Sequence, residues 1–161
     1  MKLKTKKNII LLVIIFILFG CYKSQKINYH TFLKNTWFEK DKIEFSQKIS
    51  DSSKIYSLYI SIRHTTEYRY DNIIMFLHHK DEKKNIMTDT IEINLMDDKG
   101  KPIGLGKNDI REIEKLINKK KYLKGNHIFE LELAMRKKNN IKIKKLEHIK
   151  NISVYIQEEN E

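Results

Sequence analysis

The chain has 161 residues, with 32 basic and 21 acidic side chains, a formal net charge of +11 and a single cysteine. This length suits one domain behind a leader, and one cysteine cannot form an intramolecular disulfide. The basic residues are mostly lysines, whereas arginine is favoured for bidentate recognition of phosphates and bases. The composition therefore excludes a disulfide scaffold and argues against a nucleic-acid partner.

The first residues are typical of an export signal. Residues 1–7 carry four lysines and no acid, residues 9–19 are an unbroken apolar run, and Gly20 and Cys21 follow. The run is shorter than the ~20 apolar residues that span a bilayer as a helix. Residues 18–21, Leu-Phe-Gly-Cys, resemble the lipobox of bacterial lipoproteins, which implies cleavage before Cys21 and attachment of acyl chains such as palmitate. The alternative is an uncleaved anchor helix beside an incidental cysteine. We predict a signal peptide over residues 1–20 and lipid attachment at Cys21.

Behind a polar segment, residues 21–35, which we predict to be a tether, the sequence has the pattern of short strands. Residues 55–63 alternate most clearly, with large apolar side chains at each even position from 56 to 62. A period of two indicates a strand, because successive side chains point to opposite faces of a sheet. Further strands are predicted at residues 42–49, 72–78, 86–96, 128–136 and 152–156, and a helical turn at residues 146–151.

Residues 109–123 leave two interpretations open. A cap signal at Asp109 and apolar residues with helical spacing up to residue 117 favour a helix. The alternative is a short helical turn followed by an extended stretch to residue 123. With at least six short strands and at most one short helix, the pattern predicts an all-β fold. We expect an antiparallel β-sandwich, jelly-roll or immunoglobulin-like, formed by residues 36–161 as a single domain.

The chain offers little that indicates catalysis. It has no Gly-x-Ser-x-Gly elbow and no phosphate-binding loop, and acylation would block its only thiol. His78 and His79 are adjacent on a predicted strand, so their side chains diverge, and we expect no metal site and no cofactor. Asp89 stands on an otherwise apolar strand face, where a buried carboxylate needs a partner. It either accepts a hydrogen bond, from a loop or from Arg63 or Arg136, or serves as a functional acid.

Aromatic and glycine residues are the candidates for contacts with a partner or ligand. Tyr68 and Tyr70 either stack on a sugar or pack over the end of the sandwich, and Trp37 is a further aromatic candidate. Gly104 and Gly106 belong to a glycine-rich segment, residues 100–106. This segment is either a tight connection between strands or a loop that binds a ligand.

Several short motifs are spread along the chain behind the lipobox: Trp37, SLYISIR at 57–63, YRYDNI at 68–73, TDT at 88–90, Asp98, GK at 100–101, GLG at 104–106, Asp109, and FELELAMR at 129–136. With these motifs, the sequence resembles the gliding-motility lipoproteins of the GldH type, found in Bacteroidota, from the lipobox to the last strand. Two parts depart from the family pattern: Pro102 replaces the usual aromatic residue, and Ser153 and Tyr155 stand where the last strand usually carries Gly and Arg.

The resemblance implies a lipid-anchored envelope protein that is needed for gliding and linked to type IX secretion, with no known catalytic residues. We therefore expect a non-enzymatic component that binds other proteins of that machinery through sheet edges and the loops at residues 64–71 and 97–108. The alternative is a lipoprotein that binds glycan or lipopolysaccharide through Trp37, Tyr68 and Tyr70. Surface-exported lipoproteins of this phylum tend to have acids soon after the cysteine. Residues 22–26 have none, so we expect the periplasmic face of the outer membrane.

Overall fold

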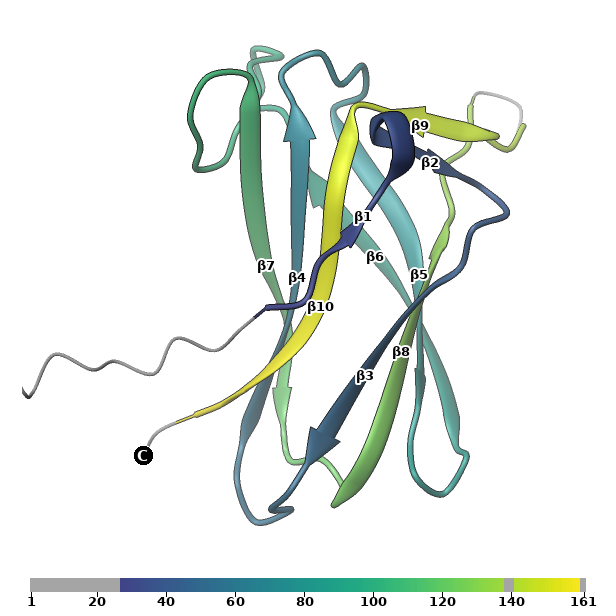
Figure 1. Cartoon of the computed structure of the whole chain (residues 1–161), viewed down its shortest axis with the longest axis vertical. Coiled ribbons are helices and arrows are strands. Elements are labelled where there is room, and N and C mark those ends of the chain that lie inside the picture. Colours follow the sequence, from purple (N-terminus) through teal and green to yellow (C-terminus); the bar gives the residue numbers. More distant parts are fainter. Residues whose placement is uncertain (1–26, 138–140, 160–161) are drawn as a thin grey trace, which may run out of the picture.

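The computed structural model describes residues 27–137 and 141–159. They form two four-stranded antiparallel sheets packed as a sandwich (Figure 1), so the prediction of an antiparallel β-sandwich is confirmed. Sheet I has the strand order β1-β10-β4-β7 and sheet II the order β3-β8-β5-β6, while β2 pairs with β9. The elements are β1 (His30–Thr31), η1 (Leu33–Asn35), β2 (Thr36–Phe38), β3 (Ile43–Ile49), β4 (Tyr56–Thr65), β5 (Asn72–Lys80), β6 (Ile86–Asn94), β7 (Ile110–Lys120), β8 (Gly125–Leu133), β9 (Lys145–Glu147) and β10 (Ile149–Glu158).

Alternation along the strands builds the core between the sheets. In β5 and β8, buried positions alternate with half-buried ones over most of each strand. Because successive side chains of a strand face opposite ways, one row enters the core and the other lies on the outer face. Strands β4 and β10 are buried at nearly every position. Within the described residues, the 3-10 turn η1 is the one helical element, and no helix there is long and apolar enough to cross a membrane.

Residues 110–120 form strand β7 for their whole length, so the helical interpretation of residues 109–117 is wrong. The apolar spacing that suggested a helix has another origin. Ile113 and Ile117 pack against the core, whereas Leu116 lies on the outer face and is 48% exposed. Pairing along all of β4 outweighs the cap signal and the weak local propensity. The helical turn predicted at residues 146–151 is also wrong, because β9 and β10 occupy this stretch with His148 between them at a φ of 70°.

The described part of the predicted tether lies against the sandwich. Strand β1 pairs with β10, and the Asn28 carbonyl accepts a hydrogen bond from Ser153 Oγ at 2.7 Å. Phe32 is buried and stacks on Trp37 with 5.3 Å between the ring centroids. Ordered packing thus begins by residue 28. The predicted signal peptide, Cys21 and residues 22–26 lie outside the described residues.

Candidate functional site

The two loops expected to contact partners lie side by side at one end of the sandwich, the upper end in Figure 1. The Asp71 carbonyl accepts hydrogen bonds from the amides of Leu95 and Met96, at 2.7 and 3.0 Å. The Thr66 amide donates to the Asp109 carbonyl at 2.7 Å. Leu95 and Met96 precede the second loop and Asp109 follows it, so these backbone bonds fix both ends of residues 97–108 against residues 64–71.

Tyr68 holds the first of these loops in place. Its hydroxyl donates to the Asn72 carbonyl at 2.9 Å, and its ring lies edge-on to those of Tyr70 and His64, at centroid distances of 5.7 and 6.0 Å. The Tyr68 side chain is buried, and this burial raises the pKa of its phenol well above the ordinary value. A buried neutral phenol packs the end of the sandwich, so only the half-buried Tyr70 of this pair reaches solvent.

Trp37 and Asp89 occupy positions that their sequence patterns did not indicate. Trp37 is fully buried, and its indole Nε1 donates to the Asp41 carbonyl at 3.0 Å, so its ring packs the core. Asp89 is exposed, like every residue of β6 from Ile86 to Thr90. Both interpretations of Asp89 assumed a buried carboxylate, and this condition is not met.

The glycine-rich segment closes over the edge of β7. Leu105 and Glu112 exchange two backbone hydrogen bonds, at 2.9 and 2.7 Å. A Cβ at Gly104 would lie 2.6 Å from the Glu112 carbonyl oxygen, and one at Gly106 would lie 2.0 Å from the Ile110 carbonyl oxygen. Backbones can approach this closely only where a side chain is missing. Both glycines thus serve a tight connection, one of the two roles that the sequence left open.

This connection leaves Leu105 projecting into solvent, 85% exposed, beside a hollow of about 620 Å³. Strand β7 is the last strand of sheet I, so beyond Glu112 its outer edge has no strand partner among the described residues. Such an edge offers unpaired backbone donors and acceptors to another chain. We call this region the loop-end surface; it consists of Ile103, Gly104, Leu105, Glu112, Ile113 and Glu114.

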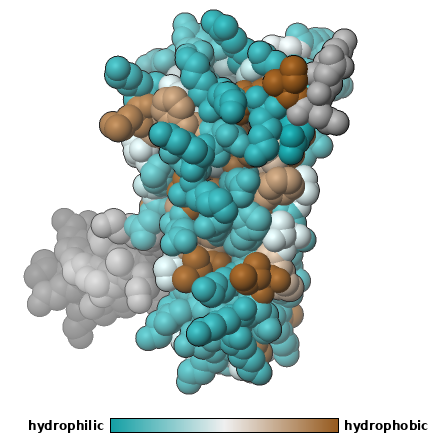
Figure 2. Space-filling model, turned by 90° about the vertical axis from the view of Figure 1, so that its right-hand side faces the viewer, coloured by the Kyte–Doolittle hydropathy of each residue, from teal (hydrophilic) through white to brown (hydrophobic). Residues whose placement is uncertain are grey.

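Leu105 differs from the other exposed apolar residues in its position beside an open strand edge, and not in its hydrophobicity. On the face shown in Figure 2, apolar side chains form separate spots among hydrophilic ones. Single exposed apolar residues are normal on soluble domains and indicate nothing by themselves. The exposed large apolar residues come from many elements: Leu33, Phe38, Ile55, Ile86, Met87, Leu105, Leu116, Leu123 and Ile141.

Glu112 also joins the N-terminal segment to sheet I, a role that the sequence did not reveal. Its carboxylate accepts hydrogen bonds from the Tyr29 hydroxyl, from Ser61 Oγ at 2.9 Å and from Arg63 Nε at 2.9 Å. Partial burial acts to raise the pKa of the Glu112 carboxyl, but these hydrogen bonds outweigh it and hold the pKa below its ordinary value. Arg63 and Ser61 belong to the SLYISIR motif, but their partner is evident only once β4 pairs with β7.

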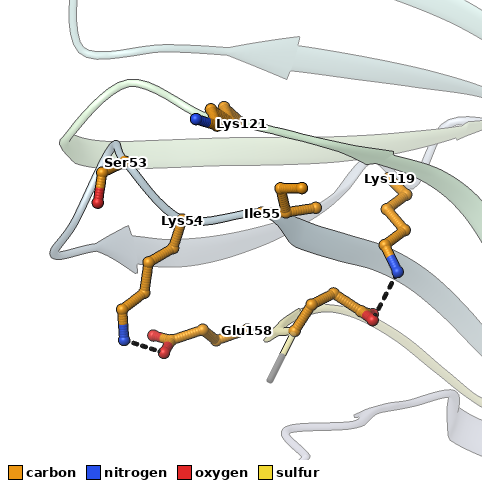
Figure 3. Close-up of a pocket in the computed structure, with 7 residues that line it drawn as sticks. Ser53, Lys54, Ile55, Lys119, Lys121 and Glu158 are labelled. Atoms are coloured by element: carbon orange, nitrogen blue, oxygen red, sulfur yellow. Dashed lines mark hydrogen bonds and ion pairs between the residues drawn. The ribbon is translucent and has the colours of Figure 1, made fainter. Parts of the chain in front are cut away.

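A second hollow, of about 660 Å³, opens at the opposite end of sheet I (Figure 3). Two ion pairs lie across it, Lys54 with Glu158 and Lys119 with Glu159, the latter at 2.7 Å. Each carboxylate is already paired with a lysine, and exposed pairs of this kind typically contribute about 0–1 kcal/mol. The glutamates of this hollow are therefore neutralised by its lysines, and we assign the hollow no role.

Comparison with known proteins identifies the family of this chain. The family model described as GldH lipoprotein matches residues 25–156. The chain is 29% identical over 125 residues to a protein of Christiangramia forsetii named gliding motility lipoprotein GldH homolog, covering 75% of this chain and 76% of that protein. It is 23% identical over 159 residues to the gliding motility lipoprotein GldH of Flavobacterium johnsoniae, covering 98% and 100%. The match runs from the N-terminal segment into the last strand, and the chain belongs to the GldH lipoprotein family.

Proposed function

We propose that this protein is a non-enzymatic, lipid-anchored component of the gliding-motility machinery that binds other envelope proteins and is linked to type IX secretion. The relatives from Christiangramia forsetii and Flavobacterium johnsoniae are named as gliding-motility lipoproteins, which supports the motility role. The lipid is attached at Cys21, and the absence of acids in residues 22–26 supports the periplasmic face of the outer membrane.

The observation that carries the binding role is the loop-end surface. Leu105 is held in solvent by backbone bonds on the segment that carries it, and the open edge of β7 follows directly. A backbone that is already held in place loses less conformational freedom on binding than a mobile loop, and a free strand edge supplies backbone hydrogen bonds. These features suit a protein partner that places a segment along β7 and covers Leu105.

The hydrogen bonds of ionisable side chains support a structural rather than a catalytic role for these residues. The carboxylate of Glu112 accepts hydrogen bonds from three donors, which join the N-terminal segment, β4 and β7. The buried pair His79 and His127 hydrogen-bond to each other at 2.8 Å. Groups engaged in this way hold elements together.

The experiment compares two leucines of nearly equal exposure. Leu105→Asp places a charge on the loop-end surface, and Leu33→Asp places the same charge on η1, where the leucine is 89% exposed. We expect Leu105→Asp to abolish crosslinking of the membrane-bound protein to envelope proteins in native cells and to impair gliding, while Leu33→Asp preserves both. Unchanged crosslinking in a folded Leu105→Asp protein would contradict this surface assignment.

A further inference from the structure

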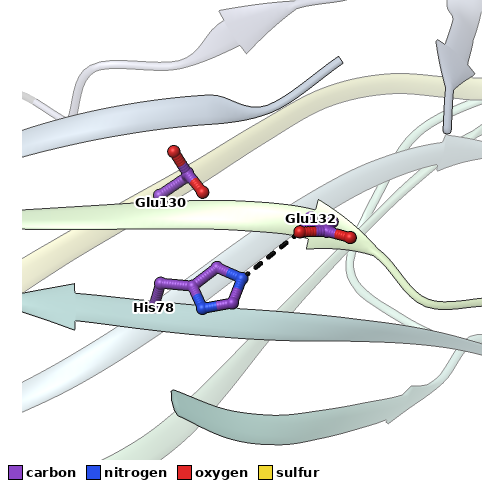
Figure 4. Close-up of side chains that lie close together, drawn as sticks. All are labelled: His78, Glu130 and Glu132. Atoms are coloured by element: carbon purple, nitrogen blue, oxygen red, sulfur yellow. Dashed lines mark ion pairs between the residues drawn. The ribbon is translucent and has the colours of Figure 1, made fainter. Parts of the chain in front are cut away.

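The outer face of sheet II gathers three metal-ligating side chains from two strands (Figure 4). His78 on β5 lies directly opposite Glu130 on β8, and Glu132 follows two residues later on the same face. One ligand atom from each residue lies within 4.8 Å of the others. Histidine nitrogen and carboxylate oxygen are the ligands that Zn²⁺ takes in catalytic sites with three protein ligands.

His78 is oriented for this role by a neighbouring hydroxyl. Its Nδ1 lies 2.9 Å from Thr88 Oγ1 on β6, which leaves Nε2 on the side of the two glutamates. Nε2 is shielded from water and has no hydrogen-bond partner among the described residues, although Glu132 Oε2 lies 3.4 Å away. Metal-binding histidines are commonly fixed in this way by a partner on the other ring nitrogen.

A lysine shows that the two glutamates already attract a cation. Lys42 Nζ lies 2.8 Å from Glu130 Oε1 and 3.2 Å from Glu132 Oε2. The lysine side chain is 52% exposed and precedes β3, so it can turn into solvent without moving a strand.

We propose that His78, Glu130 and Glu132 bind a divalent transition metal ion such as Zn²⁺, which displaces the ammonium group of Lys42. The divalent ion replaces a single positive charge between two carboxylates and gives Nε2 of His78 a partner. Three protein ligands leave one tetrahedral position for water. His79 takes no part, because its side chain is buried on the opposite face of β5.

The test uses the full chain without a histidine tag, purified in detergent and titrated with ZnCl₂ at pH 7. We expect one saturable site, weakened at least about tenfold by His78→Gln and by Glu132→Gln. The matched control is Glu44→Gln, which removes an exposed glutamate opposite Glu130 on β3 and should leave the affinity unchanged. Lys42→Met removes the competing cation and should tighten binding.

Cobalt provides a second readout, because a Co²⁺ ion bound by nitrogen and oxygen has a visible absorption spectrum that should vanish in His78→Gln. Urea unfolding of each variant establishes that it is folded. Equal affinity in all variants would mean non-specific binding to surface acids and would overturn the proposal. So would the absence of saturable Zn²⁺ binding to the parent chain, or weaker binding by Lys42→Met.

Discussion

At the scale of single residues, the buried pair His79 and His127 forms a contact of the core that depends on pH. His127 Nε2 lies 2.8 Å from the Leu123 carbonyl and donates to it, so its Nδ1 is the acceptor for His79 Nε2 at 2.8 Å. The His79 ring also stacks on Phe129 with centroids 4.5 Å apart. A second proton on His79 would place a positive charge in this buried pair.

Burial first, and then the nearby His127 and Lys120, lower the pKa of His79 to about 4, although Asp81 and Asp89 act against them. An unfolded histidine has a pKa of about 6.5, so the unfolded state binds more protons below that pH. The contribution of His79 to the free energy of unfolding is therefore fully present above about pH 6.5. It is lost as the pH falls toward 4, and the loss amounts to at most about 3 kcal/mol.

The measurement is the free energy of urea unfolding between pH 7 and pH 5, above the range in which carboxylates titrate. Replacing His79 by Phe should flatten this dependence, because the new ring cannot take up a proton. Substitution of the exposed His30 by Gln should leave it as in the parent. An undiminished slope in His79→Phe would show that other groups cause the decline.

At the scale of elements, close packing of backbone against backbone decides how the glycine-rich segment meets β7. A Cβ at Gly106 would overlap the Ile110 carbonyl oxygen, whereas one at Gly100 would have nothing within 4 Å. Gly106→Ala must therefore displace the segment and break the bonds between Leu105 and Glu112. We expect a loss of at least about 2 kcal/mol of stability and faster hydrogen exchange at the Glu112 amide.

Gly100→Ala is the matched control for this prediction. Its φ of 72° strains an alanine by about 1 kcal/mol, but the segment can keep its place. Exchange at the Glu112 amide should then stay slow. Fast exchange in both variants would mean that the segment is not held by its close approach to β7.

The sequence predicted the sandwich because strands β3, β4 and β8 carry their own alternation and β5 contains a short apolar run. For β7 the apolar pattern suggested a helix instead. This edge strand is half open to solvent, so Leu116 on its outer face adds an apolar residue to Ile113 and Ile117, which face the core. The sequence also missed every group formed across strands. Glu112 meets Arg63, and His78 meets Glu130, only through the register of sheet pairing. Leu105 was named within its segment, but its exposure depends on how the loop folds back.

At the scale of the whole molecule, the N-terminal segment limits how far the sandwich stands from the membrane. The described structure begins at Ile27, and Asn28 and Tyr29 already bond to sheet I. Five residues lie between Cys21 and Ile27, and the six Cα–Cα steps from one to the other span at most about 20 Å. With a lipid on Cys21, the outer face of sheet I near Ser153 stays close to the bilayer, whereas the loop-end surface lies at an end of the sandwich (Figure 1).

Anchoring through Cys21 is tested by moving the thiol. Cys21→Ser removes the sulfur at which we propose that lipid is attached, and we expect unprocessed precursor or protein released from the membrane. In the double variant Cys21→Ser with Ser24→Cys, a thiol is restored three residues away, where no lipobox precedes it. This variant should behave like Cys21→Ser, because acylation depends on the residues before the cysteine.

The measurement is the distribution of protein between membrane and soluble fractions, together with metabolic labelling by a palmitate analogue. Each acyl methylene buried in the bilayer contributes about 0.8 kcal/mol, so two or more chains hold the parent protein in the membrane fraction. Labelled, processed and membrane-bound protein in Cys21→Ser would contradict attachment at this residue. Recovery of labelling in the double variant would instead show that any thiol near the leader is acylated, which would leave Cys21 without a special role.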